Sequence, residues 1–120
     1  ARGGKQSKDY LYSGSNNPSD VAWYSEKYTH PVGNKLPNEL GIYDMSGNVW
    51  EWVQDNYSKY NKLPTINPLN EESHLTGHSF RVSRGGGWYF GNSSCRVFLR
   101  GRSLSNDKTD DQGFRLALTD

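Results

Sequence analysis

The stretch from Gly41 to Asp55 reads GIYDMSGNVWEWVQD, and the rest of the chain is organised around it. Its centre, MSGN at residues 45–48, predicts a tight turn, because glycine adopts backbone angles closed to other residues and asparagine tolerates the left-handed region. After the turn, residues 49–53 alternate between tryptophan and valine or glutamate, which is the period-two pattern of a β-strand. Asp44 before the turn and Glu51 after it are therefore expected to converge.

Composition narrows the class of protein. The 120 residues include 13 glycines, eight tyrosines and four tryptophans, which favours short strands, turns and irregular loops over helices. The length allows one domain at most, with a modest core. A net charge of +1 with interspersed signs gives no electrostatic reason to expect nucleic acid or an anionic membrane as a partner. No run is apolar enough for membrane insertion, and a single cysteine excludes an intrachain disulfide.

A few short elements are expected outside the organising stretch. Residues 20–24 predict a strand or one helical turn, and the prolines and glycine within residues 29–39 predict a loop. Residues 54–78 are polar, lack apolar periodicity and indicate a long surface excursion. Alternating side chains predict three further strands. These strands are expected over residues 80–84, 95–100 and 113–118.

Three motifs in a fixed order carry a resemblance to a known family. GNVWEW at residues 47–52, RGGGW at 84–88 and GFR at 113–115 resemble the GN(V/A)WEW, RGGSW and GFR signatures of the formylglycine-generating enzyme, or sulfatase-modifying factor, family. ARGGK at the N-terminus and THPVG at residues 29–33 match as well, so the resemblance covers nearly the whole chain.

This resemblance implies a fold class and a domain assignment. The fold would be α+β and irregular, with low secondary-structure content, and similar to a C-type-lectin-like core with short antiparallel strands. In such relatives the ARGG motif lies inside a longer domain. Residues 1–120 are therefore expected to be the C-terminal portion of a single domain of this family.

The resemblance also implies a structural calcium site in the organising stretch. Asp44 and Glu51 would supply carboxylates, and Gly47 and Val49 would supply main-chain oxygens. Ca²⁺ favours such a mixture of carboxylate and carbonyl ligands around a tight turn. The alternative is that Asp44 caps the turn and Glu51 pairs with an arginine.

The chain departs from the family pattern where oxidase chemistry would lie. The formylglycine-generating oxidases use two cysteines after the RGGS motif to bind Cu(I), and counted from Arg84 these positions hold Phe90 and Cys95. The serine of that motif is replaced by Gly87. Because a tight Cu(I) site needs two soft thiolates, we expect the oxidase chemistry to be absent. Cys95 is a catalytic candidate only under the alternative of a copper-dependent oxidase acting on a sulfatase cysteine; otherwise it is a core residue.

The region after the RGGGW motif predicts a ligand-binding surface. Its mixture of aromatic and small polar side chains suits contact with a protein or a carbohydrate. It resembles the variable proteins of diversity-generating retroelements, which carry a hypervariable surface before a closing GFRL. The favoured function is thus a non-catalytic, calcium-stabilised scaffold that presents this surface. The candidate ligand-binding residues are Trp88, Tyr89, Phe90, Asn92, Ser94, Phe98 and Arg102.

Three further expectations concern partners and location. Self-association, or pairing with the missing N-terminal half, is expected because surface normally covered by that half would be exposed. A location outside the cytoplasm of a bacterium, or secretion from it, is favoured. His74 and His78 are four residues apart but have no third ligand nearby, which argues against a zinc site.

Overall fold

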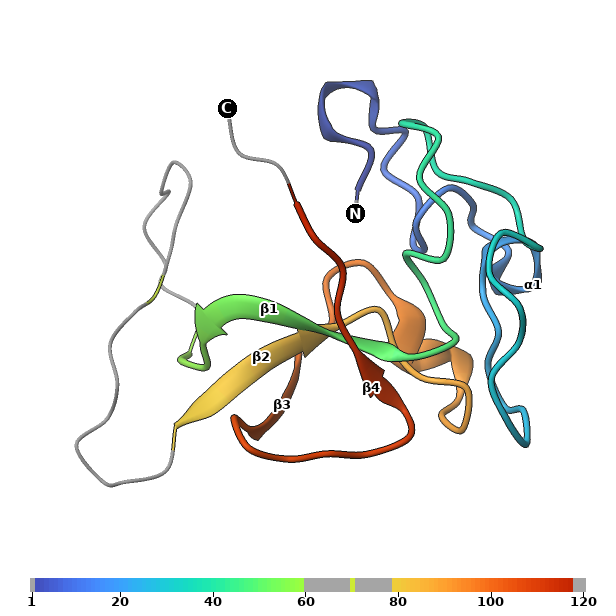
Figure 1. Ribbon diagram of the computed structural model, residues 1–120. Helices are drawn as coiled ribbons and strands as arrows, with labels where there is room; N and C mark the ends of the chain where they lie inside the picture. Colours follow the sequence, from blue (N-terminus) through green and yellow to red (C-terminus); the bar gives the residue numbers. More distant parts are fainter. Residues whose placement is uncertain (1, 60–69, 71–78, 118–120) are drawn as a thin grey trace.

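A computed structural model describes residues 2–59, 70 and 79–117. Its strands form one curled four-stranded sheet in the order β3-β2-β1-β4 (Figure 1). Most of the predicted excursion over residues 54–78, including His74 and His78, lies outside the described residues. The strands are β1 (Trp50–Asn56), β2 (Phe80–Arg84), β3 (Gly101–Leu104) and β4 (Gln112–Gly113).

The pairing of the strands is mixed. β1 pairs antiparallel with β2, with Glu51 opposite Arg84, and β2 pairs antiparallel with β3. β4 instead lies parallel to β1, with Trp50 opposite Gln112. The expectation of antiparallel strands is therefore wrong for β4. After β3 the chain crosses below the sheet and arrives at the far edge running in the same direction as β1 (Figure 1).

The helical elements are single turns. They are the 3-10 helix η1 (Gly4–Gln6), the helix α1 (Pro18–Val21) and the 3-10 helix η2 (Asn92–Cys95). In α1, the side chain of Asn17 accepts a hydrogen bond from the Ser19 N–H, and Pro18 occupies the first turn, where its missing N–H costs nothing. Of the residues 20–24, for which a strand or one helical turn was predicted, Asp20 and Val21 belong to this helical turn, whereas residues 22–24 form neither element. No helix in the described ranges is long and apolar enough to cross a membrane.

The strand predicted over residues 95–100 is not formed. Cys95 ends η2, and the next five residues are irregular. The carbonyls of Val97 and Leu99 accept hydrogen bonds from the guanidinium of Arg84, each at 3.3 Å. The side chain of Arg84 thus satisfies these carbonyls in place of a neighbouring strand. The alternating pattern of residues 95–100 therefore gave a wrong prediction of a strand. The strand expected over residues 113–118 is likewise reduced to β4, and Leu118 lies outside the described residues.

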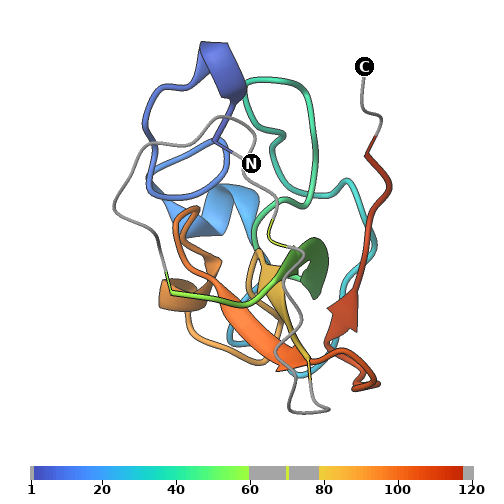
Figure 2. The same ribbon diagram turned by 90° about the vertical axis from the view of Figure 1, so that its left-hand side faces the viewer.

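The core is small. Its buried hydrophobic residues in the described part of the chain are Tyr12, Val21, Ala22, Val82 and Cys95. The N-terminal irregular segments lie at one end of the sheet, and the segment after β4 runs along one side of the molecule (Figure 2). Much apolar surface therefore remains exposed, and glycine turns and hydrogen bonds hold the irregular segments in place.

Candidate functional site

The turns of the first two sequence motifs interlock at the centre of the molecule. Gly47 N–H donates to the carbonyl of Gly85, and Trp88 N–H donates to the carbonyl of Asn48, each at 2.7 Å. The side-chain amide of Asn48 also accepts from His30 N–H and donates to His30 C=O, at 3.0 and 3.1 Å. These bonds join three distant segments into one framework.

The third motif closes onto the same region through Arg115. Its guanidinium donates to both carboxylate oxygens of Glu51, with 2.7 Å between Nε and Oε2. It also donates to the carbonyls of Tyr43 and Asp44, at 3.1 and 2.9 Å. The hydrogen bond to Glu51 is the main cause that raises the pKa of Arg115 above its ordinary value. Glu51 therefore pairs with an arginine, which was the alternative to calcium binding, and that arginine is Arg115.

Two of the residues considered for calcium contact Arg115, Glu51 through its carboxylate and Asp44 through its carbonyl. Asp44 has a φ of 56°, and its Oδ2 accepts a hydrogen bond from Gly33 N–H at 2.7 Å. No group of three or more His, Cys, Asp or Glu side chains suited to a metal forms among the described residues. A cation here would thus depend on the main-chain oxygens of Gly47 and Val49. The donor types fit Ca²⁺, but the ion would have to share Glu51 with Arg115.

Cys95 lies in the core. Its exposed fraction is 1%, and a Cβ added at Gly86 would stand 2.8 Å from the Sγ atom. Burial raises the pKa of the Cys95 thiol, and a weaker opposite effect comes from the Ser94 hydroxyl, 3.8 Å from Sγ. The thiol is therefore held protonated and out of reach of solvent.

Phe90 stands at the position where a first copper-binding cysteine would be expected. Its ring meets the ring of Trp50 edge to face, with centroids 5.8 Å apart. A Cβ added at Gly87 would lie 3.0 Å from Trp50 Cδ1 and 3.5 Å from Phe90 Cδ2. The two departures from the motif pattern, Gly87 and Phe90, thus lie against the same tryptophan.

The predicted ligand-binding residues do not all share one surface. Tyr89 is 71% exposed and Phe90 is 41% exposed, and their rings meet edge to face. Asn92 is exposed nearby in the chain, whereas Ser94 is buried and donates its hydroxyl to the carbonyl of Gly91. Trp88 is half-buried and packs edge to face against Tyr89.

The remaining two candidates lie elsewhere. Arg102 stands over the rings of Tyr57 and Phe80, at 5.4 and 5.3 Å. Phe98 is 55% exposed and has Arg96 at 6.0 Å from its ring. The rings of Trp88, Tyr89 and Phe90 thus pack against one another. We call these three residues, together with the exposed Asn92 two positions further along the chain, the aromatic surface.

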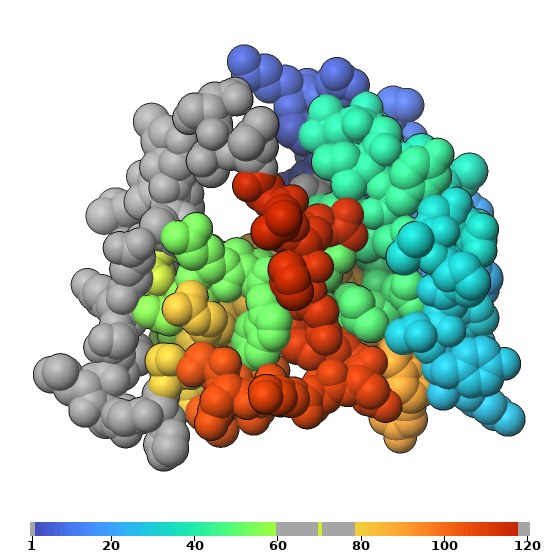
Figure 3. Space-filling model, in the orientation of Figure 1, coloured from blue at the N-terminus to red at the C-terminus, as the bar shows by residue number. Residues whose placement is uncertain are grey.

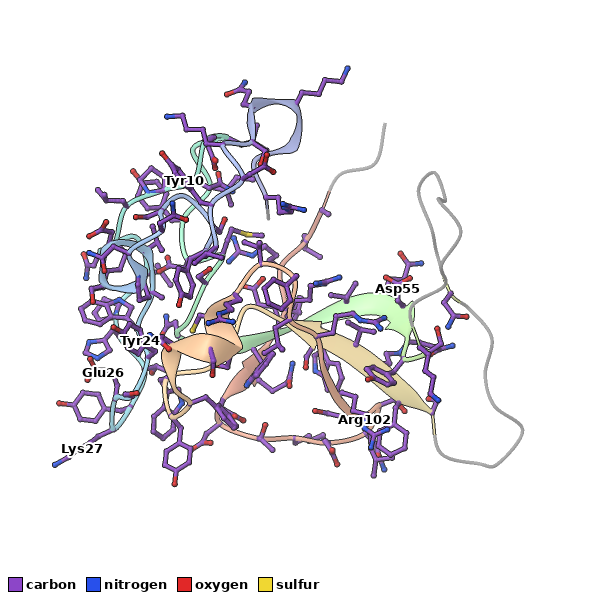
Figure 4. All side chains as sticks on the ribbon, turned by 180° about the vertical axis from the view of Figure 1, so that it is seen from behind. Tyr10, Tyr24, Glu26, Lys27, Asp55 and Arg102 are labelled. Atoms are coloured by element: carbon purple, nitrogen blue, oxygen red, sulfur yellow. The ribbon has the colours of Figure 1, made fainter. Side chains whose placement is uncertain are left out.

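Sequence reasoning missed the segment that borders this surface. Ser25 N–H donates to the carbonyl of Phe90 at 2.9 Å, and Glu26 N–H donates to the carbonyl of Trp88 at 2.7 Å. Figure 4 places Tyr24, Glu26 and Lys27 together on one side of the molecule, away from Asp55 and Arg102. No local sequence pattern predicts this contact, because it is made by backbone groups of two segments that are more than half of the chain apart in sequence.

Glycine-rich turns, a small mixed sheet and three interlocking motifs define a loop-rich α+β domain. The chain belongs to the family described as "Sulfatase-modifying factor enzyme 1-like domain", whose model matches residues 1–120.

Its relatives include several kinds of protein. "Chaperone protein LppX" of Paenibacillus barcinonensis is 35% identical over 136 residues, covering 97% of this chain and 44% of that protein. "Formylglycine-generating enzyme" of Streptomyces coelicolor is 36% identical over 94 residues, covering 74% of this chain and 29% of that protein.

Solved structures confirm the irregular α+β fold of this family. Treponema denticola variable protein 1 superposes with a TM-score of 0.76 at 34% identity, covering 92% of this chain and 41% of that one. PvdO from Pseudomonas aeruginosa superposes with a TM-score of 0.66 at 30% identity, covering 92% and 40%. The chain thus spans less than half the length of each of these four relatives.

Proposed function

We propose that this chain is a ligand-binding scaffold whose aromatic surface contacts a protein partner. The observation that carries the proposal is the exposure of two adjacent rings, Tyr89 at 71% and Phe90 at 41%. Rigid aromatic side chains mixed with asparagine, serine and glycine are typical of surfaces that bind proteins. Such rings contribute large contact areas at low cost in conformational entropy.

The backbone beneath the rings supports this proposal. Trp88 N–H is bonded to Asn48, and the carbonyls of Trp88 and Phe90 accept from Glu26 and Ser25. Little freedom is then lost when a partner binds, and this preorganisation favours affinity. The segment 24–28 would form the border of the contact, with Tyr28 66% exposed.

A random-peptide library displayed on phage tests the proposal directly. We expect enriched peptides whose affinity falls by about tenfold or more in Tyr89→Ala, as for an aromatic anchor worth about 1.4 kcal/mol or more. Phe114→Ala is the matched control, because Phe114 is 73% exposed and lies outside the aromatic surface. Peptides that bind both variants equally would contradict the proposal. If oligosaccharides on a glycan array bind the wild type and do not bind Tyr89→Ala, the partner is a carbohydrate and not a protein.

The absence of oxidase activity is part of the same proposal. It is supported by the burial of Cys95 and the raised pKa of its thiol, since catalytic cysteines are usually accessible thiolates. An anaerobic Cu(I) titration against a competing chelator, with Cys95→Ser as control, tests it. We expect no binding beyond the control. Tight one-to-one binding that disappears in Cys95→Ser would restore the formylglycine-generating oxidase.

We also propose that Ca²⁺ stabilises the organising stretch through Asp44, Gly47, Val49 and Glu51. The donor types support this proposal, and competition with Arg115 for Glu51 makes the expected affinity weak. The melting temperature of the wild type should be higher in calcium than in chelator, whereas that of Glu51→Gln should be the same in both. Asp9→Asn is the control, because Asp9 forms an exposed ion pair with Arg2. An unchanged melting temperature for the wild type would remove calcium from the proposal.

A more specific form of the proposal is that residues 89–111, which include Tyr89, Phe90 and Asn92 of the aromatic surface, vary among close siblings of this chain. The likeness to a solved protein named a variable protein supports it, as does the closing GFRL at residues 113–116. Sequencing sibling genes tests it. Differences confined to residues 89–111 are expected, and differences spread evenly along the chain would contradict it.

A further inference from the structure

A stack of aromatic and charged side chains lies next to the segment that borders the aromatic surface. The rings of Trp23 and His30 are nearly parallel, with centroids 3.9 Å apart and an angle of 12° between their planes. The ammonium of Lys35 lies 3.9 Å from the centre of the same indole, and because His30 covers one face, Lys35 occupies the other. The carboxylate of Glu26 approaches the imidazole, with 3.5 Å between Oε2 and Nε2. His30 therefore lies between an aromatic face and a carboxylate, which both attract a positive charge.

The imidazole of His30 has a hydrogen bond left to make. Its Nε2 atom is buried and forms no hydrogen bond to any described residue, and 3.5 Å to Glu26 Oε2 is long for an N–H···O bond. A positive charge on the ring would make this contact a charge-assisted hydrogen bond, which is shorter and stronger than a neutral one. Histidine is also the side chain whose ordinary change of charge falls between about pH 5 and 8. The contact is therefore placed to respond to pH.

This contact acts on Glu26 and not on His30, because the backbone of His30 is held in place. The side-chain amide of Asn48 bonds both the N–H and the C=O of His30, at 3.0 and 3.1 Å, and Asn48 is itself buried in the central turn. Glu26, in contrast, is joined to the aromatic surface, since its N–H donates to the carbonyl of Trp88 at 2.7 Å. A change at the Glu26 carboxylate thus lies one residue from the backbone of the aromatic surface.

The border segment, residues 24–28, has a strained residue where it meets the aromatic surface. Ser25 has a φ of 53°, in the left-handed region that serine rarely adopts, and its N–H donates to the carbonyl of Phe90 at 2.9 Å. Figure 3 shows this part of the chain, in light blue, lying beside the orange part that holds residues 88–90. A strained segment opens more readily when one of the contacts that hold it weakens.

We propose that protonation of His30 stabilises the contact between the border segment and the loop that carries the aromatic surface. Below about pH 6 the charged imidazole attracts the carboxylate of Glu26 and keeps the N–H groups of Ser25 and Glu26 bonded to that loop. As the pH rises to about 8 the imidazole loses its charge, the contact with Glu26 weakens and the border segment opens more often. The proton therefore favours the closed form, and the population of that form falls as the proton is lost.

The other groups around the ring do not cancel this effect. The ammonium of Lys35 opposes a second positive charge, but the indole separates it from the imidazole, and it donates to a main-chain carbonyl of α1 at 2.7 Å. The ring of Tyr28 lies 5.8 Å from that of His30, tilted by 39°, and adds no charge in this pH range. Because charge interactions weaken with distance, the carboxylate of Glu26 at 3.5 Å decides the sign.

Backbone amide exchange, followed by NMR on the full chain without a partner, tests the proposal. In the wild type, the protection factors of the Ser25 and Glu26 amides, corrected for the intrinsic effect of pH, should be about threefold to tenfold lower at about pH 7.5 than at about pH 5.5. His30→Gln and Glu26→Gln should each abolish this difference. His78→Gln is the matched control, because it removes a histidine and leaves His30 and Glu26 in place.

A second measurement needs no variant and so does not depend on how well the variants fold. In an NMR titration of the wild type, the Glu26 amide should shift with the same midpoint as the His30 ring. The Ser105 amide, bonded to the carbonyl of Ser79, is the reference and should show neither this shift nor a change in protection.

Four results would overturn the proposal. They are a Glu26 amide that stays constant while the ring titrates, equal protection at both pH values, a pH difference that survives in His30→Gln, and an equal loss of protection at Ser105. None of these results bears on the proposed binding function, since no partner is present in either measurement.

Discussion

Gly47→Ala should unfold the interlocked turns at the centre of the molecule. Gly47 has a φ of +76°, and an added Cβ would overlap the carbonyl oxygen of Trp23 and stand 2.6 Å from its nitrogen. Both are backbone atoms, so no side chain can rotate away to make room. The Trp23 carbonyl accepts from Asn48 N–H, and Gly47 N–H donates to Gly85, so any shift breaks these bonds.

Gly33→Ala isolates the cost of the overlap. Gly33 has the same φ of +76°, but an added Cβ there would meet nothing within 4 Å. It should cost only the left-handed backbone strain of about 1–2 kcal/mol, reduced by about 0.4–1 kcal/mol through the stiffer unfolded chain. Gly47→Ala adds the loss of two buried hydrogen bonds, at about 1–3 kcal/mol each. Its total of about 2–8 kcal/mol is a large part of the stability of a small domain.

Urea unfolding followed by tryptophan fluorescence measures both free energies. We expect Gly33→Ala to retain a cooperative transition close to that of the wild type. Gly47→Ala should shift the transition to far lower urea or abolish it. If the two variants differ by less than about 1 kcal/mol, which is within the range of an ordinary surface change, the close approach of the turns does not hold the fold together.

Three other predictions concern single residues. Cys95 should react with a thiol reagent at least about a hundredfold more slowly in the native protein than in urea, because it is buried and its raised pKa suppresses the thiolate; equal rates would place it at the surface. Arg84→Lys should cost about 1–2 kcal/mol in urea unfolding, because an ammonium cannot bridge the carbonyls of Val97 and Leu99 as a guanidinium does; an unchanged midpoint would show that the bridge contributes nothing. The pKa of the Glu39 carboxyl is lowered by a hydrogen bond from the backbone N–H of Glu39 itself and, to a smaller extent, from that of Lys8. The ionised carboxylate therefore stabilises the fold above its unfolded pKa, and this stabilisation is lost as the pH falls through the lower folded pKa. Stability should therefore fall less steeply below about pH 4 in Glu39→Gln than in the wild type, and parallel pH profiles would refute this.

Local sequence determined the elements that need only their own residues. The turn at residues 45–48 follows from glycine and asparagine, which adopt φ values of +76° and 67° at Gly47 and Asn48. The strands β1 and β2 follow from alternating side chains, and residues 80–84 were predicted with the bounds that the structure shows. The three motifs also specified the family, because their order and spacing are specific even though each alone is common.

Only the tertiary structure decided which distant groups meet. Glu51 pairs with an arginine 64 residues away, and the carbonyls after η2 find their donors on Arg84 rather than in a strand. Residues 25 and 26 border the aromatic surface through backbone bonds that no side-chain pattern encodes. These contacts depend on where the whole chain places each polar backbone group, since every buried group must find a partner somewhere. Local alternation describes which side of a segment is apolar, but the rest of the chain decides what that side faces.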